Sequence, residues 1–481
     1  MSLLTPQKIQ TLQRKLYLKA KREPSLRFYA LYDKVCRPDI LAHAYALSKA
    51  NGGAPGVDGV RFEDIEAYGR ERFLAQLRDE LLEKRYRPDA VLRVMIPKAN
   101  GGERPLGIPT VKDRVAQAAA KLVLEPIFEA DFTDNAYGYR PRRSAQDAVR
   151  TVHETVKVGH VQVVDADLSK YFDTIPHADL MRSISRRVSD GAILHLIKMW
   201  LKAPVEERSD RGKPIRRRSG NRGTPQGGVL SPLLANIYMR RFLKAWEQRG
   251  HGRRFGSRIV SYADDFVILC RWRAAEALAE ARRILTQIGL TLNEAKTRVC
   301  DVRNEPFDFL GYTFGVQYRF GSGRKYLAAY PSSKSARRLK AKLRRMVGSH
   351  MSWQCEENLA RDVNRVIRGW MNYFSYGTLW QTYKKLQRFV QGRIRGWLVH
   401  KHKVGSRGEC RYPATYVYDT MGVINLTGVL GMRASLQKNL VREPDAGNPQ
   451  VRFDERGQET EPRSGLRHRH NGESRRQQRL P

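Results

Sequence analysis

Cysteine is scarce in this sequence, and the five cysteines never form a C-x-x-C pair. This usage is typical of a reducing compartment and argues against a zinc finger or zinc ribbon. Long apolar runs are also missing, since no stretch approaches the ~20 residues that a membrane helix needs, and the first residues lack the apolar core of a secretory signal. We therefore expect a cytoplasmic protein that contacts no membrane.

Acidic residues are few relative to basic ones. The 481 residues include 88 Lys and Arg against 49 Asp and Glu, a formal net charge of +39. Such an excess points to a polyanion, and nucleic acid is the leading candidate partner. Because 41% of the residues are hydrophobic and 9% aromatic, the chain can still build packed cores, which excludes a disordered basic tail.

Composition and periodicity divide the chain into segments. Residues 1–60 predict a helical extension that ends in a glycine-rich loop, and residues 61–320 mix helical and strand-like stretches. Residues 331–410 carry 18 Lys and Arg against 4 Asp and Glu with helical periodicity, which predicts a basic helical bundle. A short basic segment follows at 411–440, and residues 441–481 have the composition of a disordered tail.

The most informative acidic residues lie at the ends of apolar segments. Asp264 and Asp265 separate two short apolar runs, so we expect strand, tight turn and strand, with both carboxylates at the tip. An ordinary acidic turn without a bound metal would give the same sequence pattern, because Asp is a common turn residue. A second apolar run ends at Asp167, and two strand ends that meet would bring three carboxylates together.

Three carboxylates at one site suit phosphoryl transfer. Two Mg²⁺ ions about 3.5 to 4 Å apart need anionic oxygen ligands, and magnesium takes its remaining ligands from water and substrate phosphates. Asp165, two residues before Asp167, either assists a metal or forms a salt bridge with a nearby Lys or Arg, and we favour the salt bridge.

Six ordered motifs carry a family resemblance. They are Arg104–Thr110, Asp167–Phe172, Gly223–Pro232, Tyr262-Ala263-Asp264-Asp265, Asn293–Thr297 and Phe309–Tyr312. On these motifs the sequence resembles the reverse transcriptases encoded within bacterial group II introns, also called maturases, over roughly residues 30 to 440. The resemblance implies an α+β right-hand polymerase, with fingers and palm over 61–320, followed by a thumb and a helical RNA-binding maturase (X) region over 331–410.

The resemblance also implies roles for single residues. Asp167, Asp264 and Asp265 would be catalytic residues that hold two Mg²⁺ ions. Four further residues would bind the nucleotide. Lys98 and Arg104, in the fingers, would bind the triphosphate. Phe172 would exclude a ribose 2′-hydroxyl, and Gln226 would lie near the nascent base pair. Lys296 would be a general acid for the leaving pyrophosphate or a counter-charge for phosphate.

Two further groups of residues would contact nucleic acid. The resemblance implies a primer grip at Leu310, Gly311 and Tyr312. Arginines of the basic helical region would bind RNA, namely Arg337, Arg338, Arg344, Arg345, Arg361, Arg365 and Arg368. Trp370 and Phe374 lie on the apolar face of the same region, and we expect them in its core.

The implied function is an RNA-directed DNA polymerase that assists splicing of its host intron RNA and copies it into DNA during retrohoming. Its partners would be host intron RNA, an RNA template with a DNA or RNA primer, dNTPs and target DNA. A domesticated, retron-like or diversity-generating reverse transcriptase, and a protein that is chiefly an RNA-binding splicing factor, remain alternatives. Because His468-Arg469-His470-Asn471 has no paired cysteines, we expect no nuclease domain and a primer from elsewhere.

Overall fold

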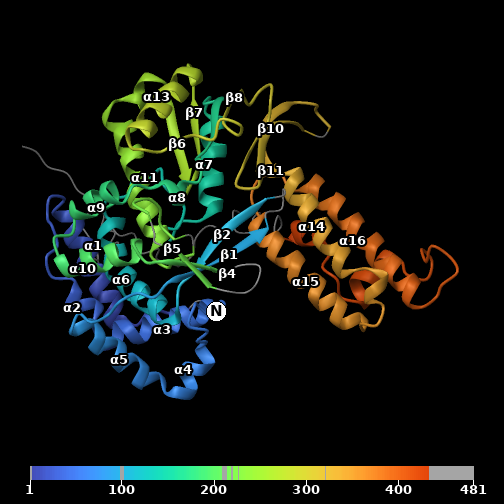
Figure 1. The fold of residues 1–481 in the computed structure, drawn as a ribbon. Coiled ribbons are helices and arrows are strands. Elements are labelled where there is room, and N and C mark those ends of the chain that lie inside the picture. Colours follow the sequence, from blue (N-terminus) through green and yellow to red (C-terminus); the bar gives the residue numbers. More distant parts are fainter. Residues whose placement is uncertain are drawn as a thin grey trace, which may run out of the picture. The chain divides into compact units, whose positions relative to one another are not determined.

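The computed structural model describes residues 3–97, 102–208, 214–217, 220–225, 227–319 and 321–432. The chain divides into two compact units, Met1–Ile424 and Asn425–Pro481. Of the second unit only 425–432 is described, with a helical turn over 426–432. The predicted disordered tail, 441–481, therefore lies outside the described residues, and the elements below belong to the first unit (Figure 1).

The N-terminal part is helical, as its periodicity predicts. Its helices are α1 (Gln7–Arg22), α2 (Tyr32–Val35), α3 (Pro38–Asn51), α4 (Phe62–Tyr68) and α5 (Arg70–Leu82). Helices α1 and α3 pack on α6 (Val111–Glu129), whose buried residues are mostly Ala, Val and Leu. The glycine-rich loop after α3 is held by the buried Arg114 guanidinium, which donates to the carbonyls of Gly52 and Ala54.

A four-stranded sheet lies mostly within the segment for which the sequence predicts the fingers. Its strands are β1 (Val91–Pro97), β2 (Glu103–Ile108), β4 (Val205–Arg208) and β5 (Pro214–Arg217), in the order β2-β1-β4-β5. β1 pairs antiparallel with β2 and parallel with β4, and β4 pairs antiparallel with β5. Arg216 and Arg217 thus lie on one strand of a hairpin, formed by β4 and β5, in this sheet.

The central antiparallel sheet has the order β6-β7-β3-β8, and we call it the palm sheet because it lies within the segment for which the sequence predicts fingers and palm. Its strands are β3 (Gln162–Asp167), β6 (Ser257–Tyr262), β7 (Asp265–Cys270) and β8 (Arg298–Asp301). Side chains alternate between two buried faces, because Val163 and Val267 join one core cluster and Val164 and Ile268 join another. Helix α7 (Ala145–Lys157) packs on β6 and β7, and α13 (Ala274–Gln287) packs on β3 and β7 (Figure 1).

Further helices lie between β3 and β6 in the chain. They are α8 (Tyr171–Thr174), α9 (His177–Ser185), α10 (Gly191–Leu201), α11 (Ser231–Gln248) and α12 (His251–Arg254). A third antiparallel sheet, in the order β11-β10-β9, was not predicted. It consists of β9 (Phe307–Phe309), β10 (Tyr312–Tyr318) and β11 (Lys325–Pro331). β11 leads directly into the basic helical region.

The basic region is helical, as its periodicity predicts. It contains α14 (Ser333–Met346), the 3₁₀ turn η1 (Ser349–Met351), α15 (Glu356–Tyr373), α16 (Trp380–Lys401) and the π-helical turn η2 (Tyr416–Thr420). Helix α14 packs on both α15 and α16. Phe374 is buried and Trp370 packs on it with ring centroids 4.6 Å apart, so the expected core position of both residues is confirmed.

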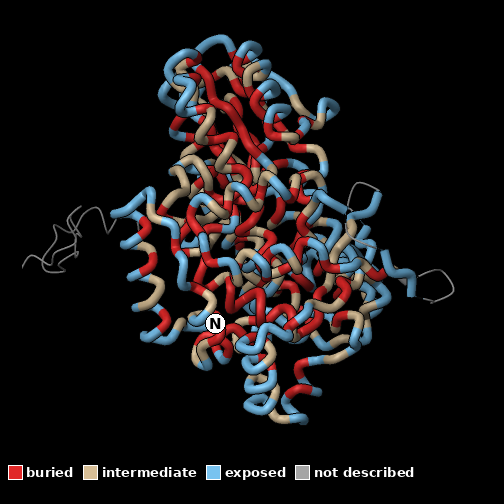
Figure 2. Tube along the Cα trace, turned by 60° about the vertical axis from the view of Figure 1, so that its left-hand side comes forward, coloured by how far each residue is buried: buried red, intermediate tan, exposed pale blue. Residues whose placement is uncertain are grey.

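Burial follows this architecture. Figure 2 shows buried segments in the interior of the first unit and exposed segments on its outside. The largest core cluster joins residues from α1 through α13, so the N-terminal helices and the palm share one interior. Within the part of the chain that the structure describes, no helix is both long enough and apolar enough to span a membrane.

Candidate active site

Strand pairing brings the three predicted carboxylates together. Asp167, the last residue of β3, is the direct cross-strand partner of Asp265, the first residue of β7. Tyr262 is the partner of Asp265 on the other side, so Ala263 and Asp264 form a two-residue hairpin loop between β6 and β7. The sequence pattern of strand, turn and strand is therefore confirmed, with all three acids at the same end of the palm sheet.

The hairpin loop has an unusual backbone. Ala263 has a φ of 60°. Glycine adopts this backbone conformation readily, but it is unfavourable in free energy for an alanine. A neighbouring glycine supports the loop: a Cβ on Gly138 would lie 2.9 Å from the carbonyl carbon of Tyr262 and closer still to the amide nitrogen of Ala263. Only glycine lets this segment touch the backbone of the loop so closely.

Two other contacts hold Gly138 in place. Its carbonyl accepts a hydrogen bond of 2.8 Å from the buried Asn236 side chain on α11. The residues just before it pair with β6, since the Tyr137 amide donates to the Ser261 carbonyl and the Ser261 amide donates to the Asn135 carbonyl, both at 2.8 Å. Neither Gly138 nor Asn236 was predicted from the sequence, and the only signal was a glycine in an otherwise polar segment.

The electrostatics of the site favour a cation. Burial raises the pKa of Asp264, and the nearby Asp167 carboxylate raises it further. Burial, followed by repulsion from Asp264, Asp167 and Asp165, raises the pKa of Asp265 to about 6. Asp265 is nevertheless exposed, so its carboxylate stays accessible from solvent although protein surrounds much of it. A positive charge placed there would relieve the repulsion among the carboxylates.

Two side chains contact Asp167. The Lys296 ammonium lies 2.7 Å from the Asp167 carboxylate, and the Asn293 side-chain amide donates to the same oxygen at 3.2 Å. The hydrogen bond to Asp167 raises the pKa of Lys296, so this lysine is protonated at neutral pH. Both residues belong to one sequence motif, and the structure brings that motif to the three carboxylates.

The donor set fits divalent magnesium in its chemistry. Carboxylate oxygens are hard ligands, and magnesium completes its shell with water and substrate oxygens. Among the described residues, no group of three or more His, Cys, Asp or Glu side chains is already arranged to hold a metal ion. With Lys296 bonded to Asp167, metal binding at this carboxylate requires the ammonium to move aside or to share it.

Asp165 has the role that we favoured from the sequence. The Arg298 guanidinium lies 3.5 Å from its carboxylate, and the two residues are direct partners in the pairing of β3 with β8. Burial raises the pKa of Asp165 to about 6, while Arg298 acts in the opposite direction. Asp165 is therefore a salt-bridged neighbour of the site.

The predicted nucleotide contacts are partly described. Arg104 lies on β2, close enough to Asp264 for its charge to favour the ionised carboxylate. Lys98 and Gln226 lie outside the described residues. Beside Gln226, a Cβ on Gly227 would collide with the carbonyl oxygen of Gly107, so this glycine lets the loop approach β2 closely.

Phe172 lies on α8 beneath other aromatic side chains. It is only 5% exposed, and its ring makes edge contacts with Tyr171 and Tyr139 at centroid distances of 5.7 and 6.4 Å. Tyr139 is itself exposed and lies near Asp264. Partial burial raises the pKa of Tyr139, and the charge of Asp264 raises it further. Phe172 therefore forms part of a floor of aromatic rings beside the carboxylates.

The predicted primer grip is a hairpin loop between β9 and β10. Leu310 and Gly311 have φ values of 49° and 79°, as in a two-residue type I′ turn. The Tyr373 hydroxyl donates to the Leu310 carbonyl at 2.9 Å, and the Ser332 amide donates to the Gly311 carbonyl. Tyr312 is fully buried and its hydroxyl donates to the Tyr373 carbonyl, so it supports the turn from the core.

The predicted RNA-binding arginines are all exposed. Four lie on α14 (Arg337, Arg338, Arg344 and Arg345) and three on α15 (Arg361, Arg365 and Arg368). Arg365 pairs with Asp362 at 3.3 Å, and the Arg344 guanidinium lies over the Phe389 ring at 5.3 Å. Exposed guanidinium groups can bind phosphates.

Comparison with protein families gives two matches. Residues 96–314 match the reverse transcriptase (RNA-dependent DNA polymerase) family, and residues 336–412 match the group II intron, maturase-specific domain. The first match contains the three carboxylates and the grip hairpin. The second covers nearly all of α14, α15 and α16.

Individual proteins are also similar to this chain. The chain is 37% identical to protein YkfC of Escherichia coli over 341 residues, which cover 63% of this chain and 87% of YkfC. It is 36% identical to the group II intron-encoded protein LtrA of Lactococcus lactis over 213 residues, which cover 44% of this chain and 34% of LtrA. A solved telomerase from Candida albicans, in complex with a TWJ fragment of telomeric RNA, is similar with a TM-score of 0.40 at 13% identity, over 69% of this chain and 62% of the telomerase chain.

Proposed function

Since the chain belongs to the group II intron-encoded reverse transcriptases that carry a maturase domain, we propose that Asp167, Asp264 and Asp265 perform its RNA-directed DNA polymerase reaction. The pairing of β3 with β7, which aligns Asp167 with Asp265, is the observation that carries this assignment. The match to the maturase-specific domain favours an intron-encoded enzyme over the retron-like and diversity-generating alternatives.

The reaction joins the primer 3′-hydroxyl to the α-phosphate of a dNTP and releases pyrophosphate. Two Mg²⁺ ions bound by the three carboxylates would activate the hydroxyl and stabilise the charge on the leaving group. Arg104 would bind phosphate oxygens of the dNTP from the fingers. Because Lys296 is protonated, it can hold a phosphate oxygen or give its proton to the leaving pyrophosphate.

Phe172 would select the sugar of the nucleotide. We expect Phe172→Val, which keeps an apolar side chain but removes the ring, to raise ribonucleotide incorporation relative to deoxynucleotide incorporation about tenfold or more, because less bulk opposes a 2′-hydroxyl. The measurement is kcat/KM for dNTP and rNTP of the same base on one primer–template. A ratio unchanged from wild type would contradict the assignment, and kcat/KM for dNTP reports any general damage.

The helical region would bind the host intron RNA and assist its splicing. Its exposed arginines lie on α14 and α15, within the segment that matches the maturase-specific domain. Phosphate contacts of this kind supply affinity that falls steeply with salt. Copying of the spliced intron into target DNA during retrohoming would then use both regions of one protein.

The two activities should separate by mutation. We expect simultaneous replacement of Arg361, Arg365 and Arg368 by alanine to lower intron RNA affinity and splicing assistance by about tenfold or more, since three phosphate contacts are lost. Primer extension on a homopolymer RNA template with a DNA primer should stay within about threefold of wild type, because the palm is untouched. Filter binding, a splicing assay and primer extension on the same preparations provide the measurements.

A matched control removes the same charge elsewhere. Helix α5 carries three exposed arginines, Arg70, Arg72 and Arg78, and their replacement by alanine lowers the net charge by the same amount. If the α5 variant loses splicing assistance as strongly as the α15 variant, the effect comes from net charge and the proposed surface is wrong. If wild type extends no primer even with Mg²⁺, the polymerase assignment fails.

A further inference from the structure

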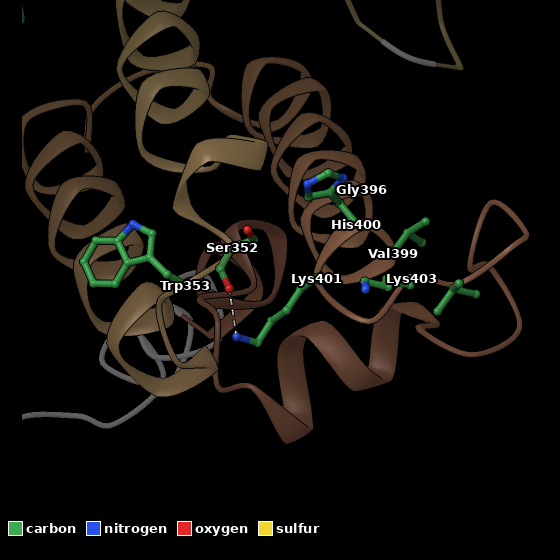
Figure 3. Close-up of a pocket in the computed structure, with 8 residues that line it drawn as sticks. Ser352, Trp353, Gly396, Val399, His400, Lys401 and Lys403 are labelled. Atoms are coloured by element: carbon green, nitrogen blue, oxygen red, sulfur yellow. Dashed lines mark hydrogen bonds between the residues drawn. The ribbon is translucent and has the colours of Figure 1, made fainter.

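A pocket of about 610 Å³ lies at the end of α16 in the maturase-matching region (Figure 3). One side is formed by Ser352 and Trp353, in the segment between η1 and α15. The other side is formed by the last turns of α16 and the residues after it, including Val399, His400, Lys401 and Lys403. None of the polymerase residues lines this pocket.

Trp353 is the unusual member of the pocket. Its side chain is 75% exposed, although an indole is a large apolar group that soluble proteins normally cover. Elsewhere in the region, Trp370 and Trp397 pack into the core. An exposed indole that lines a pocket is therefore available to a ligand with an apolar face.

The segment that carries Trp353 is held rigidly. The Lys401 ammonium donates to the Ser352 carbonyl at 3.0 Å (Figure 3). It also donates to the Gln354 carbonyl at 2.7 Å, on the other side of the tryptophan. The same ammonium lies 5.2 Å from the centre of the Trp397 ring, which fixes its own position. Backbone hydrogen bonds within 348–354 tighten the turn further. The backbone that carries the indole is thus held in place before a ligand arrives, which lowers the entropy cost of ordering this turn on binding.

The charge of the pocket selects the class of ligand. His400, Lys401 and Lys403 line it, and none of its described lining residues is acidic. Apolar contact comes from Trp353 and Val399. A planar aromatic group with a phosphate attached to it matches both features, because the ring stacks on the indole and the phosphate meets the cations.

We propose that this pocket binds an unpaired nucleobase of a structured RNA, with the base stacked on Trp353 and its adjoining phosphate beside Lys403. The proposal rests on the RNA-binding role proposed above and adds a site for single-stranded RNA to it. A paired base is already stacked in its helix, so the pocket recognises loops and bulges rather than duplex. Lys401 is a positioning residue, since its ammonium holds the turn.

The test compares two RNAs on the full-length protein. The probes are a hairpin with an unpaired loop that carries one 4-thiouridine, and a blunt RNA duplex of the same length. We expect Trp353→Ala to weaken binding of the looped hairpin about tenfold and to leave duplex binding unchanged, because one stacked base is lost. Trp353→Phe should restore most of the affinity, since a phenyl ring also stacks. Photocrosslinking should join the thiouridine to the peptide that contains Trp353.

The matched control is Trp380→Ala. Trp380 is 54% exposed and begins the same helix, 16 residues before Gly396 of the pocket, which is about 24 Å along an α-helix. This variant should bind the looped hairpin as wild type does. If Trp380→Ala and Trp353→Ala weaken binding equally, the effect belongs to exposed aromatic surface in general and the pocket assignment is overturned.

Three other results would overturn the proposal. They are unchanged hairpin binding by Trp353→Ala, an equal loss for hairpin and duplex, and altered self-association in light scattering with RNA binding intact, which would make the pocket a protein contact. Primer extension on a homopolymer template is measured in parallel and should not change. A wild-type protein that binds the hairpin through Trp353 but extends no primer would refute the polymerase assignment alone.

Discussion

Asp264→Asn is expected to reduce cDNA synthesis by roughly 10³-fold or more while RNA affinity stays within about twofold of wild type. The variant keeps the size of the side chain and removes the negative charge that would hold magnesium. Metal stabilisation of transition-state charge contributes several kcal/mol, and about 4 kcal/mol corresponds to about 10³-fold in rate. Single-turnover primer extension and RNA filter binding measure the two quantities.

The same variant should be at least as stable as wild type. Asp264 lies in a cluster where Asp167 and Asp265 repel it, and burial already disfavours its charge. Removing one charge relieves this repulsion in the absence of metal. Thermal unfolding in EDTA should therefore give an unchanged or higher Tm. A lower Tm together with lost activity would mean that the variant damages the fold.

Asp301→Asn is the matched control for this change. Asp301 lies at the opposite end of the palm sheet, where it pairs with Gln162 across the strands and with the exposed Arg303. Loss of that surface ion pair should cost about 1 kcal/mol of stability or less and leave cDNA synthesis intact. If Asp264→Asn retained activity close to that of Asp301→Asn, Asp264 could not be a metal ligand.

The strand ends that carry the carboxylates could be predicted because their signal is local. Apolar runs that end in acids predict strand ends, and antiparallel pairing then brings Asp167 and Asp265 together. The helical character of α14 to α16 was likewise predicted from periodicity. In both cases, residues close in sequence carry the information.

What could not be predicted depends on contacts between distant segments. Gly138 is 125 residues from Ala263, and no local pattern marks a glycine that must touch a remote backbone. The sheet of β9 to β11 was missed because Phe309–Tyr312, where β9 turns into β10, was interpreted only as a primer-grip motif. The bond between Lys296 and Asp167 also joins distant positions and appears only in the folded chain.

Gly138→Ala is expected to lower kcat for cDNA synthesis by about 10²-fold with little change in KM for dNTP. The added methyl group would lie closer than van der Waals contact to the Tyr262 and Ala263 backbone, and backbone atoms cannot move aside as the end of a flexible side chain can. The hairpin tip must therefore shift, and it carries Asp264. A displacement of about 1 Å in a catalytic group can cost roughly 10²-fold in rate. Gly138 is thus a positioning residue, and steady-state kinetics on one primer–template separate kcat from KM.

Two controls separate this effect from ordinary destabilisation. Gly191→Ala places a methyl group where no atom lies within 4 Å, at the start of α10, and should leave kcat unchanged. Val149→Ala makes a cavity in the core cluster beside the palm, which should lower Tm without moving the hairpin tip. If Gly138→Ala and Val149→Ala lose kcat in proportion to their loss of Tm, the contact acts through stability alone. A large kcat loss at a Tm above that of Val149→Ala would instead show that the distance between Gly138 and Ala263 sets the position of Asp264 opposite Asp167.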